Sequence, residues 1–404
     1  MTSTTETLRD IFADNGRGLQ HQGLRRNNER AVLSVVGFNN GVSNADIARV
    51  SGLAPQTVSA ILTTLDRMGL IMRGDVLRGR RGQPATPIFL RAEGAFAVGI
   101  EIGLRHTEVL LLNFHAEVIT RQRRTYCHPN INTLVADVAE MVSQVRWGIT
   151  AAEQDRVIGM GLALPTMLIE QMQHAAISDA ERALWQTIDL AGELERAVGL
   201  PTTVFNDGNA ACWAELIASP QPRPGNFIYL MVSHTIAAGI VGGGALWEGP
   251  GTNSANLGAM LVEDGTGQWQ PANQIASLTA LLAQLEQGGH QLDVAEIAHW
   301  DWDSFGAILD RWIETAARAI ARVAYNTIAV IESRLLVIDG VMPDTITQRL
   351  VDAVDRHLKE MPTPLRLSIA VMRGHLGAMA PAIGAAELPL FRRYLSRSLL
   401  DLTS

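Results

Sequence analysis

The chain has 404 residues, of which 47% are hydrophobic and two are cysteines, Cys127 and Cys212. This length exceeds what a single hydrophobic core usually organises, so we expect two or three domains. Two cysteines are too few for a disulfide framework or a cysteine-rich metal site. The longest apolar run, 157–169, is too short to span a bilayer, and residues 1–10 do not resemble a secretory signal. We therefore expect a cytoplasmic protein.

The net charge of −8 is distributed unevenly along the chain. Residues 15–91 contain eleven arginines and four acidic residues, a balance of about +7. Residues 1–14 contribute about −2 and the remainder about −13. A basic N-terminal module on an acidic body predicts that a polyanion binds the first part alone.

The basic module has the helix pattern of a helix-turn-helix. Apolar residues at helical spacing predict helices over 24–36, 44–51 and 55–68. Ser43 is suited to cap the second helix, and Gly52 to end it. Two short helices joined by a tight glycine turn are the signature of this motif.

Polar residues near the start of the third helix are expected to read DNA. Val58 belongs to the buried stripe of this helix, so that Gln56, Thr57 and Ser59 face outward. Residues at this place in a helix-turn-helix reach base edges in the major groove.

An arginine-rich hairpin follows the third helix. Residues 70–73 and 87–90 have the pattern of two strands, and the turn between them holds Arg80 and Arg81. Arginine flanked by glycine can enter a narrow minor groove, where the negative potential is concentrated. The alternative is a small helical domain whose arginine-rich loop is only solvated. The order of the elements favours a winged helix-turn-helix over 24–91, preceded by an N-terminal extension, 1–23.

The body of the chain has the pattern of a duplicated α/β fold. Three β-rich runs lie between residues 96 and 125, alternating helices and strands follow, and a second half opens in the same way at Phe227. Two halves of this kind predict a two-lobed domain with a cleft between the lobes. We assign it to 95–404, with lobes over about 95–220 and 226–404.

Nearly the whole chain resembles the ROK family, which joins repressors, open reading frames and sugar kinases. The resemblance is carried by residues 24–27, 51–59, 79–84, 205–211, 246–258 and 383–386. It implies an α/β protein with an N-terminal winged helix-turn-helix before a two-lobed actin/hexokinase-like (ribonuclease-H-like) duplicated domain. That domain would bind an effector and form a homodimer.

The resemblance also implies an effector site. Asn206 and Asp207 match the sugar-site motif of the family, and Asn253 and Asn256 lie in the loop that matches the next motif. In the kinases, the matching aspartate is the general base that deprotonates the attacked hydroxyl. Without a phosphoryl donor, Asp207 would still accept hydrogen bonds from sugar hydroxyls. The alternative is a helix cap, because a predicted helix follows directly.

Three departures from the family pattern argue against a kinase. Glu101-Ile102-Gly103 stands where the kinases have an Asp-x-Gly phosphate loop, and 233–237 replaces their Gly-Thr-Gly-x-Gly loop. Asp339-Gly340 replaces a glycine pair near the adenosine site. Phosphate cradles depend on inward N–H groups in conformations that favour glycine. We therefore expect that the domain neither binds ATP nor phosphorylates sugars.

The structural zinc site of the family is also expected to be missing. Asn256-Leu257-Gly258-Ala259 replaces a Glu-x-Gly-His segment, and no cysteine follows Cys212. A four-ligand site cannot form without these residues. We expect no metal and no cofactor, and the effector need not be the glucose-type sugar of the kinases.

The favoured hypothesis is a repressor of sugar transport or catabolism genes. It would bind operator DNA as a dimer, as helix-turn-helix proteins bind palindromic half-sites, and a sugar or sugar derivative would release it. Arg25, at the entry to the first helix, completes the expected DNA-binding set. One alternative is an active sugar kinase with an appended DNA-binding domain. The other is a regulator controlled by a protein partner.

Overall fold

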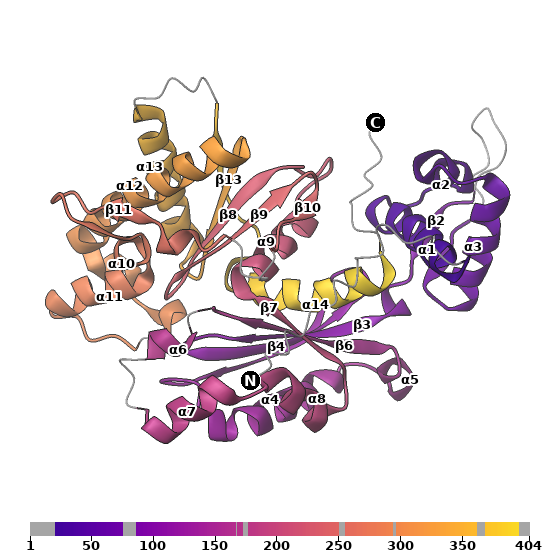
Figure 1. Ribbon diagram of the computed structural model, residues 1–404, viewed down its shortest axis with the longest axis horizontal. Helices are drawn as coiled ribbons and strands as arrows, with labels where there is room; N and C mark the ends of the chain where they lie inside the picture. The colour runs from indigo at the N-terminus through magenta and orange to yellow at the C-terminus, as the bar shows by residue number, and fades with distance from the viewer. Residues whose placement is uncertain are drawn as a thin grey trace, which may run out of the picture. The chain divides into compact units, whose positions relative to one another are not determined.

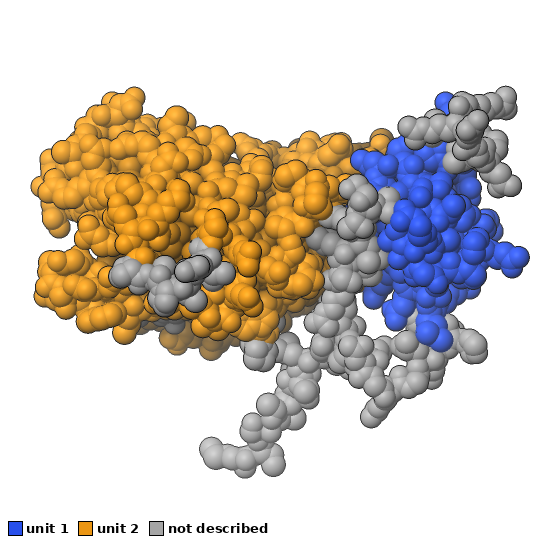
Figure 2. All heavy atoms as spheres, turned by 90° about the horizontal axis from the view of Figure 1, so that it is seen from above, with its two compact units in different colours: residues 1–90, 394–396 blue, residues 91–393, 397–404 orange. Residues whose placement is uncertain are grey.

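A computed structural model describes residues 21–75, 86–166, 168–172, 177–249, 255–293, 296–361 and 368–395. The chain forms two compact units, coloured separately in Figure 2. Unit 1 comprises residues 1–90 and 394–396, and unit 2 comprises residues 91–393 and 397–404.

Unit 1 consists of three helices and a small hairpin. Its elements are α1 (His21–Phe38), α2 (Asn44–Ser51), α3 (Pro55–Arg67), β1 (Ile71–Arg73) and β2 (Ile88–Leu90). The hydroxyl of Ser43 accepts the N–H of Asp46, whose carboxylate accepts the N–H of Ser43 in return. This capping box begins α2, and Gly52 ends it in the left-handed region with φ 70°. The predicted helix-turn-helix is therefore present in the structure.

The hairpin pairs β1 with β2 in antiparallel register, with Ile71 opposite Leu90. Ile71 and Ile88 are buried with Val35, Leu62 and Leu65 of the helices, which form the core of this unit. The predicted wing tip, with Arg80 and Arg81, lies outside the described residues.

The first lobe of unit 2 is built on a five-stranded sheet with strand order β5-β4-β3-β6-β7. The strands are β3 (Phe96–Ile102), β4 (His106–Asn113), β5 (Val118–Thr125), β6 (Val157–Leu164) and β7 (Thr202–Asn206). The first three form an antiparallel meander, whereas β6 and β7 run parallel to β3. This is the meander that the sequence predicts.

Helices cover both faces of this sheet (Figure 1). On one face lie α4 (Ile131–Arg146), α7 (Asp179–Thr187) and α8 (Leu190–Val198). Val98 and Ile100 of the sheet pack with Val138 and Leu194 of these helices in one apolar core. The opposite face carries α14 (Ala380–Tyr394).

The second lobe repeats the plan with the strand order β10-β9-β8-β13-β14. Its strands are β8 (Phe227–Val232), β9 (Ile236–Gly242), β10 (Ala245–Leu246), β13 (Leu335–Gly340) and β14 (Ala370–Arg373), with a hairpin of β11 (Leu261–Glu263) and β12 (Trp269–Pro271). Its main helices are α11 (Leu278–Gln287), α12 (Gly306–Ile331) and α13 (Asp344–Glu360), and the short ones elsewhere in unit 2 are α5 (Ala151–Gln154), α6 (Leu168–Gln171) and α10 (Asn273–Ala276). Trp312 is fully buried in the core of this lobe. The duplicated actin/hexokinase-like α/β fold is confirmed.

Two helices tie the lobes together through backbone contacts at glycine. A Cβ added at Gly384 of α14 would lie 1.8 Å from the carbonyl oxygen of Ala210 in α9 (Asp207–Ala218). A Cβ added at Gly99 of β3 would lie 1.9 Å from the carbonyl oxygen of Ala382. Because no side chain fits at either contact, α14 lies directly against both α9 and the first sheet. Of the helices that the structure describes, none is long and apolar enough to cross a membrane.

Candidate functional site

The carboxyl ends of three parallel strands meet at one edge of the first sheet. Glu101 of β3 pairs with Ala163 of β6, which pairs with Phe205 of β7. Asn206 ends β7, and Asp207 begins α9 directly after it. In open α/β sheets, ligands bind outside the carboxyl ends of the strands. This edge is therefore the candidate ligand site.

Asn206 and Asp207 have different roles at the start of α9. The Oδ1 atom of Asn206 accepts the N–H of Asn209 at 3.0 Å and caps the helix. Its Nδ2 group donates to Oγ1 of Thr166 at 2.9 Å and to Oδ1 of Asp207 at 3.2 Å. Asp207 Oδ1 also accepts the N–H of Gly208, at 2.8 Å. The capping role that the sequence allowed for Asp207 thus falls to Asn206.

The surroundings of Asp207 favour its protonated form. Desolvation raises its pKa to about 7, and the nearby carboxylate of Glu101 acts in the same direction. The N–H of Gly208 opposes this shift. A carboxyl group with a pKa near neutrality can either accept or donate a hydrogen bond to a hydroxyl group.

Further ionisable side chains lie beside Glu101 within the sheet. Oε2 of Glu101 lies 3.6 Å from Nε2 of His106, and both side chains are only 9% exposed. Glu108 pairs directly with Glu101 across β3 and β4, and Nη1 of Arg123 lies 3.4 Å from its Oε2. Burial raises the pKa of Glu108, although Arg123 opposes the shift. Sequence reasoning missed His106 and Glu108; the signal was the presence of polar residues within otherwise apolar strands.

The loop 233–237 between β8 and β9, which replaces the second phosphate loop of the kinases, is held by internal hydrogen bonds. The N–H of Ser233 donates to the carbonyl oxygen of Thr235 at 2.9 Å, and that of Ile236 donates to Oδ1 of Asn273 at 2.6 Å. Oγ1 of Thr279 donates to the carbonyl oxygen of His234 at 2.6 Å. Two N–H groups of this loop are therefore already used within the protein.

The carboxylate of Asp339 is also used internally. It accepts hydrogen bonds from the hydroxyl of Tyr229 at 3.2 Å and from the N–H groups of Gly340 and Gly377, each at 2.9 Å. Asp339 is buried, and it fixes the loop that leads into α14. In the same loop, the N–H and Nδ1 of His375 contact the buried carboxylate of Glu215.

The segment that follows Asn256 forms a hydrogen-bonded hairpin. Oδ1 of Asp264 accepts the N–H groups of Thr266 and Gln268, which builds the turn between β11 and β12. Across the residues that the structure describes, no group of three or more His, Cys, Asp or Glu side chains could hold a metal ion. Asn256 itself is exposed and Leu257 after it is buried, whereas Asn253 lies outside the described residues.

The predicted DNA-reading residues of α3 lie on its exposed surface. Gln56, Thr57 and Ser59 are all exposed. The hydroxyl of Ser59 accepts a hydrogen bond from Nδ2 of Asn44 at 2.7 Å, which links α3 to α2. Arg25 is exposed on α1 and pairs with Glu29 at 3.1 Å. Ser59 therefore holds the two helices of the motif together as well as facing outward.

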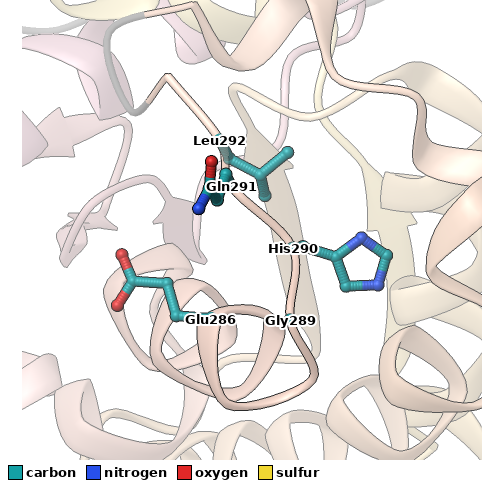
Figure 3. Close-up of a pocket in the computed structure, with 5 residues that line it drawn as sticks. All are labelled: Glu286, Gly289, His290, Gln291 and Leu292. Atoms are coloured by element: carbon teal, nitrogen blue, oxygen red, sulfur yellow. The ribbon is translucent and has the colours of Figure 1, made fainter.

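A shallow pocket of about 380 Å³ lies elsewhere, at the end of α11. Glu286, Gly289, His290, Gln291 and Leu292 line it. Figure 3 shows the side chains of Glu286 and His290 pointing away from each other. None of these five residues belongs to the site at Asp207, and they do not converge on a common point.

Comparison with known proteins agrees with both units. The family profile described as ROK family matches residues 97–390, and one described as winged helix-turn-helix DNA-binding matches residues 25–72. The xylose repressor of Bacillus subtilis is 22% identical over 388 residues, which cover 90% of this chain and 95% of the repressor.

Two solved structures share the fold. A ROK family transcriptional regulator, described as a homolog of the E. coli MLC protein, aligns with a TM-score of 0.69 at 20% identity, over 92% of this chain and 98% of that one. A ROK family glucokinase from Streptomyces griseus, in complex with glucose and AMPPNP, aligns with a TM-score of 0.58 at 19% identity. The alignment covers 73% of this chain and 99% of the glucokinase chain.

The fold and these matches define a class of protein that joins a winged helix-turn-helix to an actin/hexokinase-like domain. The chain belongs to the ROK family.

Proposed function

We propose that this protein is a transcriptional repressor that binds operator DNA and leaves it when a sugar or sugar derivative binds at Asp207. One observation carries the proposal. Asn206 and Asp207 stand at the carboxyl edge of the first sheet, whereas the N–H groups of Ser233 and Ile236, in the loop between β8 and β9, are used within the protein. The first half of this observation supports a ligand with hydroxyl groups, and the second half supports a domain that does not bind phosphate.

The assignment to DNA rests on unit 1. Its recognition helix, α3, exposes Gln56 and Thr57 near the N-terminal end, where residues of a helix-turn-helix contact base edges. Arg80 and Arg81 of the wing are proposed to add minor-groove or phosphate contacts. Arg25 would contact the phosphate backbone once its exposed pairing with Glu29 opens, because exposed ion pairs are weak.

The assignment to a sugar rests on Asp207 and on the relatives. The xylose repressor matches nearly the whole chain, and the glucokinase shares the fold of unit 2. Asn206, Asp207, Asn253 and Asn256 are the proposed effector residues, since carboxylates and amides suit the hydroxyls of a sugar. We also propose domains at 24–91 and 95–404, a homodimer on palindromic DNA, and a cytoplasmic location.

The proposed domain is not an enzyme. Phosphoryl transfer depends on oriented donors around the phosphates, and the corresponding N–H groups of Ser233 and Ile236 are engaged. We expect neither zinc nor ATP to bind.

A sugar panel tests the proposal against its kinase alternative. A sugar that binds the native state should raise the melting temperature of the full-length protein, with no ADP formed when ATP is added. Sugar-dependent ADP release at ordinary enzymatic rates would make the protein a kinase. Failure of every sugar to raise the melting temperature would favour control by a protein partner.

A further inference from the structure

The corner of the first sheet around Glu101 contains buried polar atoms that lack partners. Oε2 of Glu101, Nε2 of His106 and Oε1 of Glu108 are buried, and none has a hydrogen-bond partner among the described residues. The three residues are 7%, 7% and 1% exposed. Buried polar atoms usually have a hydrogen-bond partner, so these three atoms are candidates to bind a group from outside the chain.

This corner adjoins the site at Asp207. Glu101 of β3 and Phe205 of β7 are both paired with Ala163 of β6, so they lie in one row across the sheet. Two strand spacings, each of about 4.8 Å, separate them. The nearby charge of Glu101 also raises the pKa of Asp207, in line with this placement in the sheet. A pyranose ring with its substituents spans such a gap between two side chains.

The chemistry of the corner favours a ligand that brings hydrogen-bond donors over one that brings acceptors. A carboxylate at Glu101 offers only acceptors, whereas Asp207, with a pKa of about 7, can accept or donate a hydrogen bond. Arg123, the arginine of the same row, is already directed to Glu108. Nε2 of His106 lies 3.6 Å from the carboxylate of Glu101, beyond hydrogen-bond distance. A phosphate or carboxylate group on the ligand would bring more acceptors and more negative charge. A protonated amine brings three donors and the opposite charge, and hydrogen bonds between charged groups are the stronger ones.

We propose that Glu101 is a second acidic residue of the effector site, and that the pair Glu101–Asp207 selects a polyhydroxyl ligand that carries a protonated amine. The amine binds at Glu101, and hydroxyl groups bind at Asp207. The inference rests on the proposed function, because it assigns the chemical class of the ligand that binds there.

Matched sugars test the proposal on the full-length protein. D-Glucose, D-galactose and D-mannose are each compared by calorimetry with their 2-amino-2-deoxy derivatives and their 6-phosphates. In at least one series the amino sugar should bind most tightly and the phosphate should not bind measurably. Glu101→Gln should lower the affinity for the amino sugar roughly 10-fold or more and leave the affinity for the neutral parent sugar nearly unchanged. Glu286→Gln, an exposed acidic residue of the pocket at α11, serves as the matched control.

A measurement without any sugar distinguishes a change at the site from misfolding of the variant. The pKa of Asp207, followed by NMR of labelled aspartate, should fall in Glu101→Gln and stay unchanged in Glu286→Gln. An unmoved pKa, tighter binding of the neutral or phosphorylated sugar, or an amine preference that survives Glu101→Gln would each overturn the inference. If no sugar in any series binds, the proposed function fails, and the inference fails with it.

Discussion

Asn206 caps helix α9 through its Oδ1 atom, whereas its Nδ2 group donates to the carboxylate of Asp207 next to it. The two residues thus have separate roles at the end of β7. The amide of Asn206 fixes the start of the helix, and its bond to Asp207 orients the carboxylate. An acid held in this way at the carboxyl edge of a parallel sheet is suited to bind a ligand.

Replacing Asp207 with Asn should stabilise the ligand-free protein in a pH-dependent way. The pKa of Asp207 is raised to about 7, so the folded state binds a proton that the unfolded state releases near pH 4. Ionised Asp207 therefore lowers stability increasingly as the pH rises from about 4 to about 7. Asp207→Asn should add on the order of 1–4 kcal/mol to the free energy of unfolding at pH 8 and little near pH 4.

Urea unfolding at the two pH values measures this effect, and Asp264→Asn provides a control of opposite sign. Hydrogen bonds from Thr266 lower the pKa of Asp264, so its contribution to stability is present above pH 4 and lost as the pH falls further. Asp264→Asn should therefore be destabilising at pH 8. An Asp207→Asn variant with the same stability difference at both pH values would contradict the assigned pKa.

Much of this fold follows from local sequence patterns. The β-rich runs at 106–113 and 118–125 coincide with β4 and β5, because runs rich in β-forming residues and split by a turn mark such strands directly. The capping box at Ser43 likewise involves residues three apart. Local patterns of this kind contain most of the information on where an element begins and ends.

The contacts of the site could not be predicted in this way. The pairing of Glu101 with Glu108 depends on the register of two strands, and the bond between Asn44 and Ser59 depends on the angle between two helices. The sequence places the carboxylate of Asp339 where the kinases have a glycine pair near the adenosine site. The structure surrounds it with donors, because Tyr229 and the loop at Gly377 pack against it. The role of Asp207 as a ligand remains a prediction.

Two substitutions in the recognition helix should have different consequences. Gln56→Ala should relax the base preference at one position of each half-site by roughly 1–3 kcal/mol, with stability unchanged. Ser59→Ala removes the acceptor for Asn44 and should lower the stability of unit 1 by about 1 kcal/mol. Binding to a duplex library and thermal unfolding separate the two effects. If Gln56→Ala leaves the base preference intact, another face of α3 reads the DNA.

Replacing Arg80 and Arg81 of the wing with Ala should weaken binding to all DNA sequences alike. Each phosphate that an arginine no longer neutralises reduces the slope of log K against log salt by about 1. Gel-shift titrations at several salt concentrations measure the slope. Arg349→Ala, which removes an arginine that pairs with Asp310 in unit 2, is the matched control. Equal slopes for wild type and the wing variant would place these arginines outside the interface.

A methyl group at Gly384 should disrupt the packing of α14. Its Cβ would lie 1.8 Å from the carbonyl oxygen of Ala210, so backbone must move, and we expect a loss of about 3 kcal/mol or more. Gly225→Ala is the control, because a Cβ at Gly225 meets no atom within 4 Å. Thermal unfolding compares the two variants. Similar melting temperatures for both would show that α14 does not lie against α9 as closely as described.

The most direct test of the proposed repressor measures operator binding with and without sugar, in wild type and in Asp207→Ala. The duplex is selected from a random library by the full-length protein, and the sugar is the one that most raises its melting temperature. At pH 8, above the pKa of about 7, Asp207 is ionised, and hydrogen bonds to a charged carboxylate contribute about 1.5–3 kcal/mol each. The variant should therefore need roughly 10- to 150-fold more sugar for release. Its affinity for DNA without sugar should match that of wild type, because the carboxylate belongs to unit 2 and not to the helix-turn-helix. Release of Asp207→Ala at the wild-type sugar concentration would contradict the account.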